Sequence, residues 1–220
     1  FLQDSFTELE PVLDSGALKG NDSDFLREEI PQAIHHSLEG VNRVACIVRS
    51  MKEYSQAGKR QMTLSNLNHL IDNALVISRS EWKYVAEVET DLQDDLPDIN
   101  CDAGEIGQVV LNMVVNAAHA IGEKISGSDE RGLIRVQTRA KDSGVEILIQ
   151  DSGIGVPEHL QGKIFEPFFT TKEVGKGTGQ GLAIAQAAVI RHGGNLAVES
   201  EHKKGTIFRI FLPRILDAVS

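Results

Sequence analysis

The hydrophobic periodicity of the chain changes once, near residue 58, and this change constrains the fold more than any other feature. From Ile34 to Val48 apolar residues recur in steps of four and three, a pattern typical of a helix that packs along a partner helix. Beyond the segment around Gly58, helical and strand patterns alternate. The sequence therefore predicts a helical dimerisation segment over residues 1–58 and a separate domain over residues 59–220. A helical appendage that packs on its own domain is the alternative.

The second region has the pattern of an α+β protein. Asp142-Ser143-Gly144 is a hairpin-type turn signal between two of its strands, and a second pair of adjacent strands follows near the C-terminal end. The fold class predicted is an α/β sandwich with antiparallel strand pairs in its C-terminal half. The helices are expected over 64–78, 103–121 and 182–191, and the strands over 85–92, 132–140, 145–151, 195–200 and 206–212.

Composition excludes some partners and leaves others open. With 32 acidic and 22 basic residues the net charge is −10, which argues against a nucleic-acid-binding face but not against phosphates held by backbone N–H groups. Cys46 and Cys101 lack metal-site spacing and are expected to be reduced thiols of a cytoplasmic protein. Because no apolar run reaches the roughly 20 residues of a membrane span, no membrane contact is expected. An anchor upstream of Phe1 remains open.

A carboxylate followed by a glycine turn ends the strand predicted over 145–151. Asp151 leads directly into Gly153 and Gly155. A glycine turn lets a ligand approach the backbone, and a buried carboxylate needs hydrogen-bond donors, of which an adenine amino group is one. Taken alone, the motif favours a simple Asp-Gly turn.

Four alternate glycines stand immediately before the helix predicted over 182–191. A loop of this composition can fold over phosphates, and the helix that follows offers unpaired N–H groups and the positive end of its dipole. It is not a P-loop, because Lys176 is followed by Gly177 instead of Ser or Thr. A flexible surface loop is the alternative.

Two asparagines four residues apart lie on one face of the apolar helix predicted over 103–121. Asn112 and Asn116 are costly to bury without partners, and an amide oxygen is a suitable ligand for Mg²⁺. His119 lies on roughly the same side. The alternatives are that the asparagines tether neighbouring backbone and that the histidine is structural or solvated.

These motifs, with the phenylalanine cluster over 165–169, resemble in order and spacing the ATP-binding domain of sensor histidine kinases in the GHKL ATPase superfamily. Residues 112–116 resemble its N box, 151–155 its first glycine box, 165–169 its F box and 177–182 its second glycine box, and Gly205-Thr206 resembles its terminal strand element. The resemblance covers about residues 62–214. It implies a Bergerat-type fold with a mixed, mainly antiparallel sheet covered by helices and preceded by a helical hairpin.

The resemblance also implies roles for individual residues. Asp151 would accept the adenine amino group, Asn116 helped by Asn112 would hold Mg²⁺, and His119 would face the phosphates. Residues 175–181 would form the ATP lid. The residues implied to bind ATP are Asp151, Gly153, Gly155, Lys172, Lys176, Gly177, Thr178, Gly179, Gly181, Leu182 and Thr206.

The function implied is transfer of the ATP γ-phosphoryl group to a histidine, for relay to an aspartate on a response-regulator receiver domain. None of the seven histidines carries the family's acceptor signature, in which Glu or Asp follows the histidine and a proline comes three or four residues later. The acceptor is therefore expected upstream of Phe1, with His35 or His36 as the alternative, and a homodimer is expected through the helical segment. Two other functions stay open: a GHKL-type clamp that hydrolyses ATP, and a non-catalytic nucleotide-sensing dimeric module. Other branches of the superfamily carry a glutamate at the position of Asn112, so its absence counts against the clamp.

Overall fold

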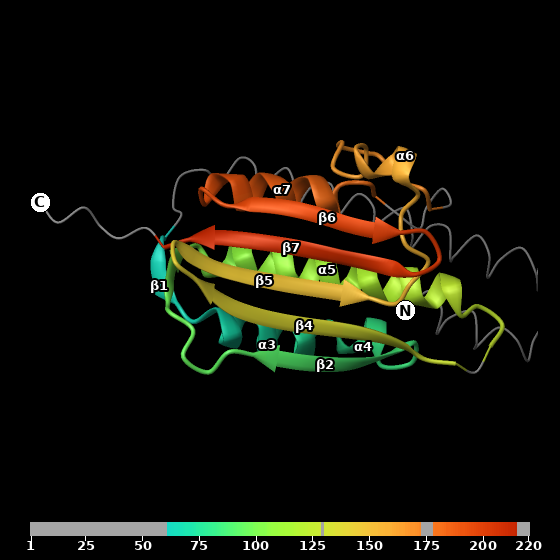
Figure 1. The fold of residues 1–220 in the computed structure, drawn as a ribbon, viewed down its shortest axis with the longest axis horizontal. Coiled ribbons are helices and arrows are strands. Elements are labelled where there is room, and N and C mark those ends of the chain that lie inside the picture. Colours follow the sequence, from blue (N-terminus) through green and yellow to red (C-terminus); the bar gives the residue numbers. More distant parts are fainter. Residues whose placement is uncertain (1–60, 129, 173–177, 215–220) are drawn as a thin grey trace, which may run out of the picture. The chain divides into compact units, whose positions relative to one another are not determined.

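The computed structural model describes residues 61–128, 130–172 and 178–214 (Figure 1). The helical segment predicted over residues 1–58, with its dimerisation, lies outside the described residues, and so do Cys46, Lys176 and Gly177.

One five-stranded sheet is the framework of this domain, in the order β2-β4-β5-β7-β6 (Figure 1). The strands are β2 (Ala86–Leu92), β4 (Gly132–Lys141), β5 (Gly144–Asp151), β6 (Asn195–Glu201) and β7 (Gly205–Pro213). β2 and β4 run parallel, whereas the three other pairs are antiparallel. The fold-class prediction is therefore confirmed. A two-stranded antiparallel ribbon of β1 (Thr63–Ser65) and β3 (Ile99–Cys101) was not predicted.

The helices α3 (Leu67–Ile77), α5 (Ala103–Lys124) and α7 (Gly181–Arg191) form the second layer, behind the sheet in Figure 1. α3 starts three residues later than predicted, because the Asn66 side chain caps it by accepting from the His69 N–H at 3.0 Å. The three residues before Asn66 belong to β1 instead. The short helices α4 (Arg79–Trp82) and α6 (Glu158–Gln161) were also missed, since a single turn carries no readable periodicity.

The core lies between α5 and the sheet. Alternate residues of β4, β5 and β7 turn toward the helices and are buried, while α5 contributes a wide apolar face. The largest side chains with almost no exposure in this layer include Ile106, Met113, Ile121, Ile134, Ile147, Ile149, Ile210 and Leu212. Cys101, a free thiol as expected, is also buried there. This packing fixes α5 against the end of β5, which positions the candidate site.

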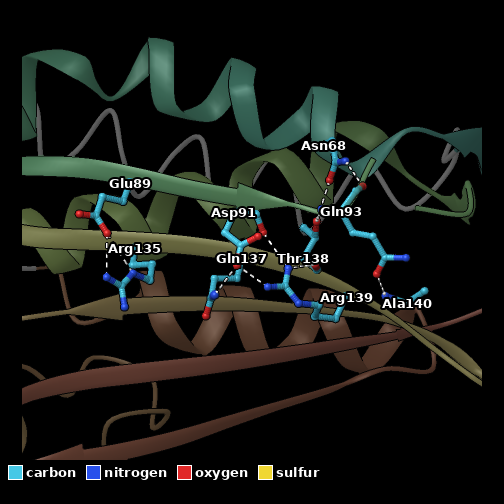
Figure 2. A network of polar contacts seen from close by, with 9 residues as sticks. All are labelled: Asn68, Glu89, Asp91, Gln93, Arg135, Gln137, Thr138, Arg139 and Ala140. Atoms are coloured by element: carbon cyan, nitrogen blue, oxygen red, sulfur yellow. Dashed lines mark hydrogen bonds and ion pairs between the residues drawn. The ribbon is translucent and has the colours of Figure 1, made fainter. Parts of the chain in front are cut away.

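The opposite face of the sheet is polar and ordered by cross-strand ion pairs (Figure 2). Arg135 Nη2 lies 2.7 Å from Glu89 Oε2, and Arg139 pairs with Asp91 on the same two strands, β4 and β2. Arg139 and then Gln137 lower the pKa of Asp91 below its usual value. Arg209 on β7 continues this pattern between Glu146 and Glu199. Opposite charges therefore face each other on neighbouring strands, and this face stays solvated while the helical face carries the site.

Candidate nucleotide-binding site

Asp151 is the last residue of β5 and turns toward the helices. The alternation Val145, Ile147, Ile149 places it on the buried face, where its exposed fraction is 4%. Its Oδ1 accepts the Gly153 N–H at 2.8 Å, so the Asp-Gly turn expected from the sequence is present. Burial raises the pKa of Asp151 to about 6, against the opposing effects of the Gly153 and Thr206 N–H groups and of the Lys124 ammonium. A buried carboxylate held in this way is suited to a ligand that donates hydrogen bonds.

The glycine turn after Asp151 is wedged between α5 and the β6–β7 hairpin. A Cβ on Gly153 would lie 2.7 Å from the backbone of Ala120 on α5. Gly155 has a φ of +68°, and a Cβ there would lie 2.2 Å from the carbonyl oxygen of Glu201. Only glycine meets both demands, left-handed backbone and close approach. The turn therefore joins the Asp151 carboxylate to α5, the helix that carries Asn116.

A side chain of the β6–β7 hairpin and one of α6 hold this turn, and sequence reasoning missed both. Ser200 Oγ accepts the Val156 N–H at 2.7 Å and donates to the Gly205 carbonyl at 2.9 Å. It also lies 3.0 Å from Oγ1 of Thr206, the residue opposite Asp151 in the β5–β7 register. Gln161 Nε2 donates to the carbonyl oxygens of both Val156 and Ser200. No local pattern marks Ser200 or Gln161, because the bonds that join Ser200 to Val156 and Gln161 to Ser200 span 44 and 39 positions of the sequence.

The three polar residues predicted on α5 do share one side of the helix but have different neighbours. Asn112 Nδ2 donates to the Gly181 carbonyl at 3.2 Å, and its Oδ1 accepts from Gln108 Nε2 at 3.0 Å. Asn116 is half-buried, and its amide makes no hydrogen bond to another described residue. His119 Nε2 lies 3.6 Å from Glu81 Oε2 on α4. The amide oxygen of Asn116 suits a hard cation, whereas both polar ends of Asn112 are engaged with protein groups.

The glycine-rich segment enters α7 through a tight contact with the phenylalanine cluster. Gly179 has a φ of +63°, and a Cβ there would lie 2.4 Å from the backbone of Phe168. The Phe168 N–H donates to the Gly179 carbonyl at 2.9 Å. Phe168 itself has a left-handed backbone, with a φ of +68°, and a side chain that is 72% exposed. Phe165 and Phe169 instead pack against the core, as an anchor for the loop would.

The remaining predicted site residues flank this segment in the sequence. Thr178 and Leu182 are half-buried on either side of the α7 start, and Leu182 packs against the core. Thr178 Oγ1 accepts the Gln180 N–H at 3.4 Å. Lys172 is half-buried at the end of its described stretch. The structure thus joins Asp151, Gly153, Gly155 and Thr206 in one cluster and Asn112 with Gly181 in another, and α5 borders both.

Residues 101–215 match the family described as histidine kinase-, DNA gyrase B-, and HSP90-like ATPase. This span contains α5, the Asp151 turn and the glycine-rich segment, and it is more than half of the chain. The chain belongs to this ATPase family. The described domain is therefore an ATP-binding domain.

The relatives of this ATPase domain are sensor kinases. The chain is 35% identical to the sensor kinase CckA of Brucella abortus over 81% of its own length, and 33% identical to the signal transduction histidine-protein kinase AtoS of Escherichia coli over 89%. It spans only 20% and 31% of the lengths of these two proteins. The domain is thus the ATP-binding catalytic domain of the sensor histidine kinase type.

A solved structure agrees with this assignment. Histidine kinase ThkA, solved in complex with the response regulator protein TrrA, aligns with a TM-score of 0.65 at 25% identity, covering 97% of this chain and 58% of that chain.

Within the described residues, no group of three or more His, Cys, Asp or Glu side chains could hold a metal ion. No helix among the same residues is long and apolar enough to cross a membrane.

Proposed function

We propose that this domain binds Mg-ATP and transfers the γ-phosphoryl group to a histidine side chain, for relay to an aspartate of a response regulator. The observation that carries the proposal is the buried Asp151 at the end of β5, held by the Gly153 N–H beside α5. A buried acceptor at this point selects a base that carries an exocyclic amino group in the right position. Guanine places a carbonyl oxygen there, which would face the carboxylate with no proton to share, so ATP is preferred over GTP.

On this proposal the residues of α5 and α7 hold the triphosphate. Asn116 supplies an amide oxygen to the metal ion, the α7 N-terminus directs N–H groups at the phosphates, His119 faces the phosphates, and Lys172 and Lys176 add positive charge. When bound, Mg²⁺ neutralises the charge that develops on the transferring group. Phosphoryl transfer depends mainly on positioning and charge neutralisation, so no nucleophilic side chain is needed within the domain.

Transfer to a histidine is favoured over hydrolysis by the chemistry at position 112. An amide cannot take a proton from water at neutral pH, and the Asn112 oxygen already accepts a hydrogen bond from Gln108. A clamp of the same superfamily needs a general base there. This observation supports a kinase and counts against a domain whose task is to hydrolyse ATP.

The partners follow from the same proposal. The receiver domain of a response regulator would take the phosphoryl group, as the ThkA–TrrA complex suggests by analogy. The proposal also includes a homodimer, formed through the helical segment predicted over residues 1–58. It places the protein in the cytoplasm.

Calorimetry and phosphate release test this function together. Mg-ATP is expected to bind and GTP is not, and sustained phosphate release is not expected. Adding a separate polypeptide with an acceptor-histidine helix is expected to yield an acid-labile phosphohistidine from ATP labelled at the γ position. Sustained release without an acceptor would instead support a hydrolytic clamp, and binding without transfer would support a nucleotide-sensing module.

Replacing Asn116 by alanine is expected to remove the magnesium dependence of ATP binding. The affinity for ATP in the presence of Mg²⁺ should fall by about tenfold, to the level measured with EDTA, because a metal ligand is lost. The unfolding midpoint should change little, since the amide has no hydrogen-bond partner among the described residues. Asn116→Asp is the matched control, because it keeps an oxygen ligand and should keep the response to Mg²⁺. An unchanged magnesium dependence in the alanine variant would show that Asn116 is not a ligand.

A further inference from the structure

A chain of three groups connects the outer side of α5 to the first residue of α7. Gln108 Nε2 donates to Asn112 Oδ1 at 3.0 Å, and Asn112 Nδ2 donates to the Gly181 carbonyl oxygen at 3.2 Å. Gln108 is exposed at the helix surface, one helical turn before Asn112 on the same face. The second bond joins residues 69 positions apart in the sequence.

The chemistry of the three groups gives this chain a direction. A carbonyl oxygen can only accept, so Asn112 must turn its amino end toward Gly181. Its oxygen then faces Gln108, whose Nε2 donates to it at 3.0 Å. A donor at position 108 therefore favours the amide orientation that holds Gly181, whereas an acceptor at position 108 favours the opposite one.

We propose that Gln108 is a positioning residue that fixes the orientation of the Asn112 amide and thereby holds the start of α7 against α5. The Asn112 side chain lies beside Gly181 without crowding it: a Cβ added to Gly181 would be 3.8 Å from Asn112 Cγ, an ordinary van der Waals distance. Two residues earlier, the Phe168 N–H holds the Gly179 carbonyl on the other side. Two hydrogen bonds therefore hold the residues at the start of α7: one from Asn112 on α5 to Gly181, and one from Phe168 in the phenylalanine cluster to Gly179.

The consequence for the nucleotide rests on the proposed function. The N–H groups of the first turn of α7 are the ones expected to face the phosphates, and an N-terminus already in place costs less free energy to order on binding. Gln108 need not touch ATP for this effect. It acts through Asn112, which places it among residues that tune affinity instead of residues that contact the reacting atoms.

The hydrogen-bond chain from Gln108 through Asn112 to Gly181 is called the relay here. Two variants at position 108, one that can only accept and one that can only donate, test it in the protein without nucleotide. Gln108→Glu can only accept, so Asn112 should invert and set its oxygen against the Gly181 carbonyl. Gln108→Lys can only donate and should preserve the native orientation. Hydrogen exchange of the first-turn amides of α7, including Ile184, whose N–H donates to the Gln180 carbonyl, should accelerate by about tenfold in Gln108→Glu and stay near wild type in Gln108→Lys. Equal exchange in both variants would overturn the proposal.

A third substitution separates the relay from the added charge. In an Asn112→Ala background the amide is absent, so Gln108→Glu should no longer change exchange in α7. Mg-ATP affinity should fall more for Gln108→Glu in the native background than in the Asn112→Ala background, where only the charge effect remains. The unfolding midpoint should be nearly unchanged, because the Gln108 side chain lies at the surface. Acceleration that persists in the Asn112→Ala background would refute the relay. Failure of ATP to bind at all would instead refute the proposed function and leave the exchange result standing.

Discussion

Asp151→Asn is expected to weaken Mg-ATP binding on the order of 100-fold while making the domain more stable at neutral pH. The carboxylate is buried, with an exposed fraction of 4%, and its pKa is raised to about 6 by that burial. Keeping it ionised above that pH therefore costs free energy, about 3 kcal/mol relative to the unfolded chain. Asparagine keeps the acceptor for the Gly153 N–H and removes the charge, so the free energy of unfolding at pH 8 should rise by about 1–3 kcal/mol.

The loss of binding has a separate physical cause. The amino end of an asparagine would face the amino group of adenine, and two donors cannot satisfy each other. The affinity for Mg-ATP should fall on the order of 100-fold, as expected where a buried polar partner is left unpaired. Calorimetry measures the affinity and urea unfolding the stability. A variant that binds Mg-ATP as tightly as the wild type would remove Asp151 from the nucleotide site.

The pH dependence of the stability gain provides the control. The folded-state pKa of Asp151, about 6, lies above the unfolded value of 3.8, so between these values the folded protein binds more protons than the unfolded chain. The wild type should therefore lose stability from this group as pH rises from about 4 to above 6. The advantage of Asp151→Asn should be full above that range and should shrink toward zero near pH 4. An advantage of equal size at pH 4 and pH 8 would show that the carboxylate charge is not its cause.

The strands and long helices of this domain could be predicted because their causes are local. Val145, Ile147 and Ile149 alternate with polar residues, so β5 could be predicted and the inward direction of Asp151 follows from its period. α5 begins at Ala103 as predicted, where the Asp102 side chain accepts the Glu105 N–H at 3.0 Å. Its end was placed three residues early, immediately before a glycine that the helix in fact includes. The four boxes could be placed for the same reason as the strands, because each is a short local pattern.

What could not be predicted depends on contacts between distant residues. β1 and β3 are three residues each and pair across more than thirty positions, too short for a periodic signal. The left-handed backbone of Phe168 is set by the Gly179 contact, and nothing in the phenylalanine itself favours it. The role expected of Asn112 toward Mg²⁺ stays a prediction, and in the structure both ends of its amide bind protein groups. The face of α5 on which it lies could be read from the sequence, but not the Gly181 carbonyl that it meets.

Gly205→Ala is expected to be the most disruptive single-methyl change in the domain. Gly205 begins β7 with a φ of +132°, and a Cβ there would lie 2.0 Å from the carbonyl oxygen of Asp151. Neither atom can move alone, because Asp151 and Thr206 are paired in the sheet and the Gly205 carbonyl accepts from Ser200 Oγ. We expect the free energy of unfolding to fall by about 3–4 kcal/mol, from the unfavourable backbone and the forced displacement together. Urea unfolding with calorimetry of Mg-ATP binding measures both consequences.

A second glycine makes this expectation specific to the site. Gly107 lies within α5, and among the described residues outside its own turn of the helix a Cβ there meets nothing within 4 Å. Gly107→Ala should therefore stabilise the domain by about 0.5–1 kcal/mol and leave Mg-ATP affinity unchanged. Asp151 is the last residue of β5, and an alanine at position 205 would displace this end of the strand. Gly205→Ala should therefore lose Mg-ATP binding even at temperatures where the protein stays folded. A folded Gly205→Ala protein with wild-type affinity would mean that the position of Asp151 does not depend on the close approach of β7.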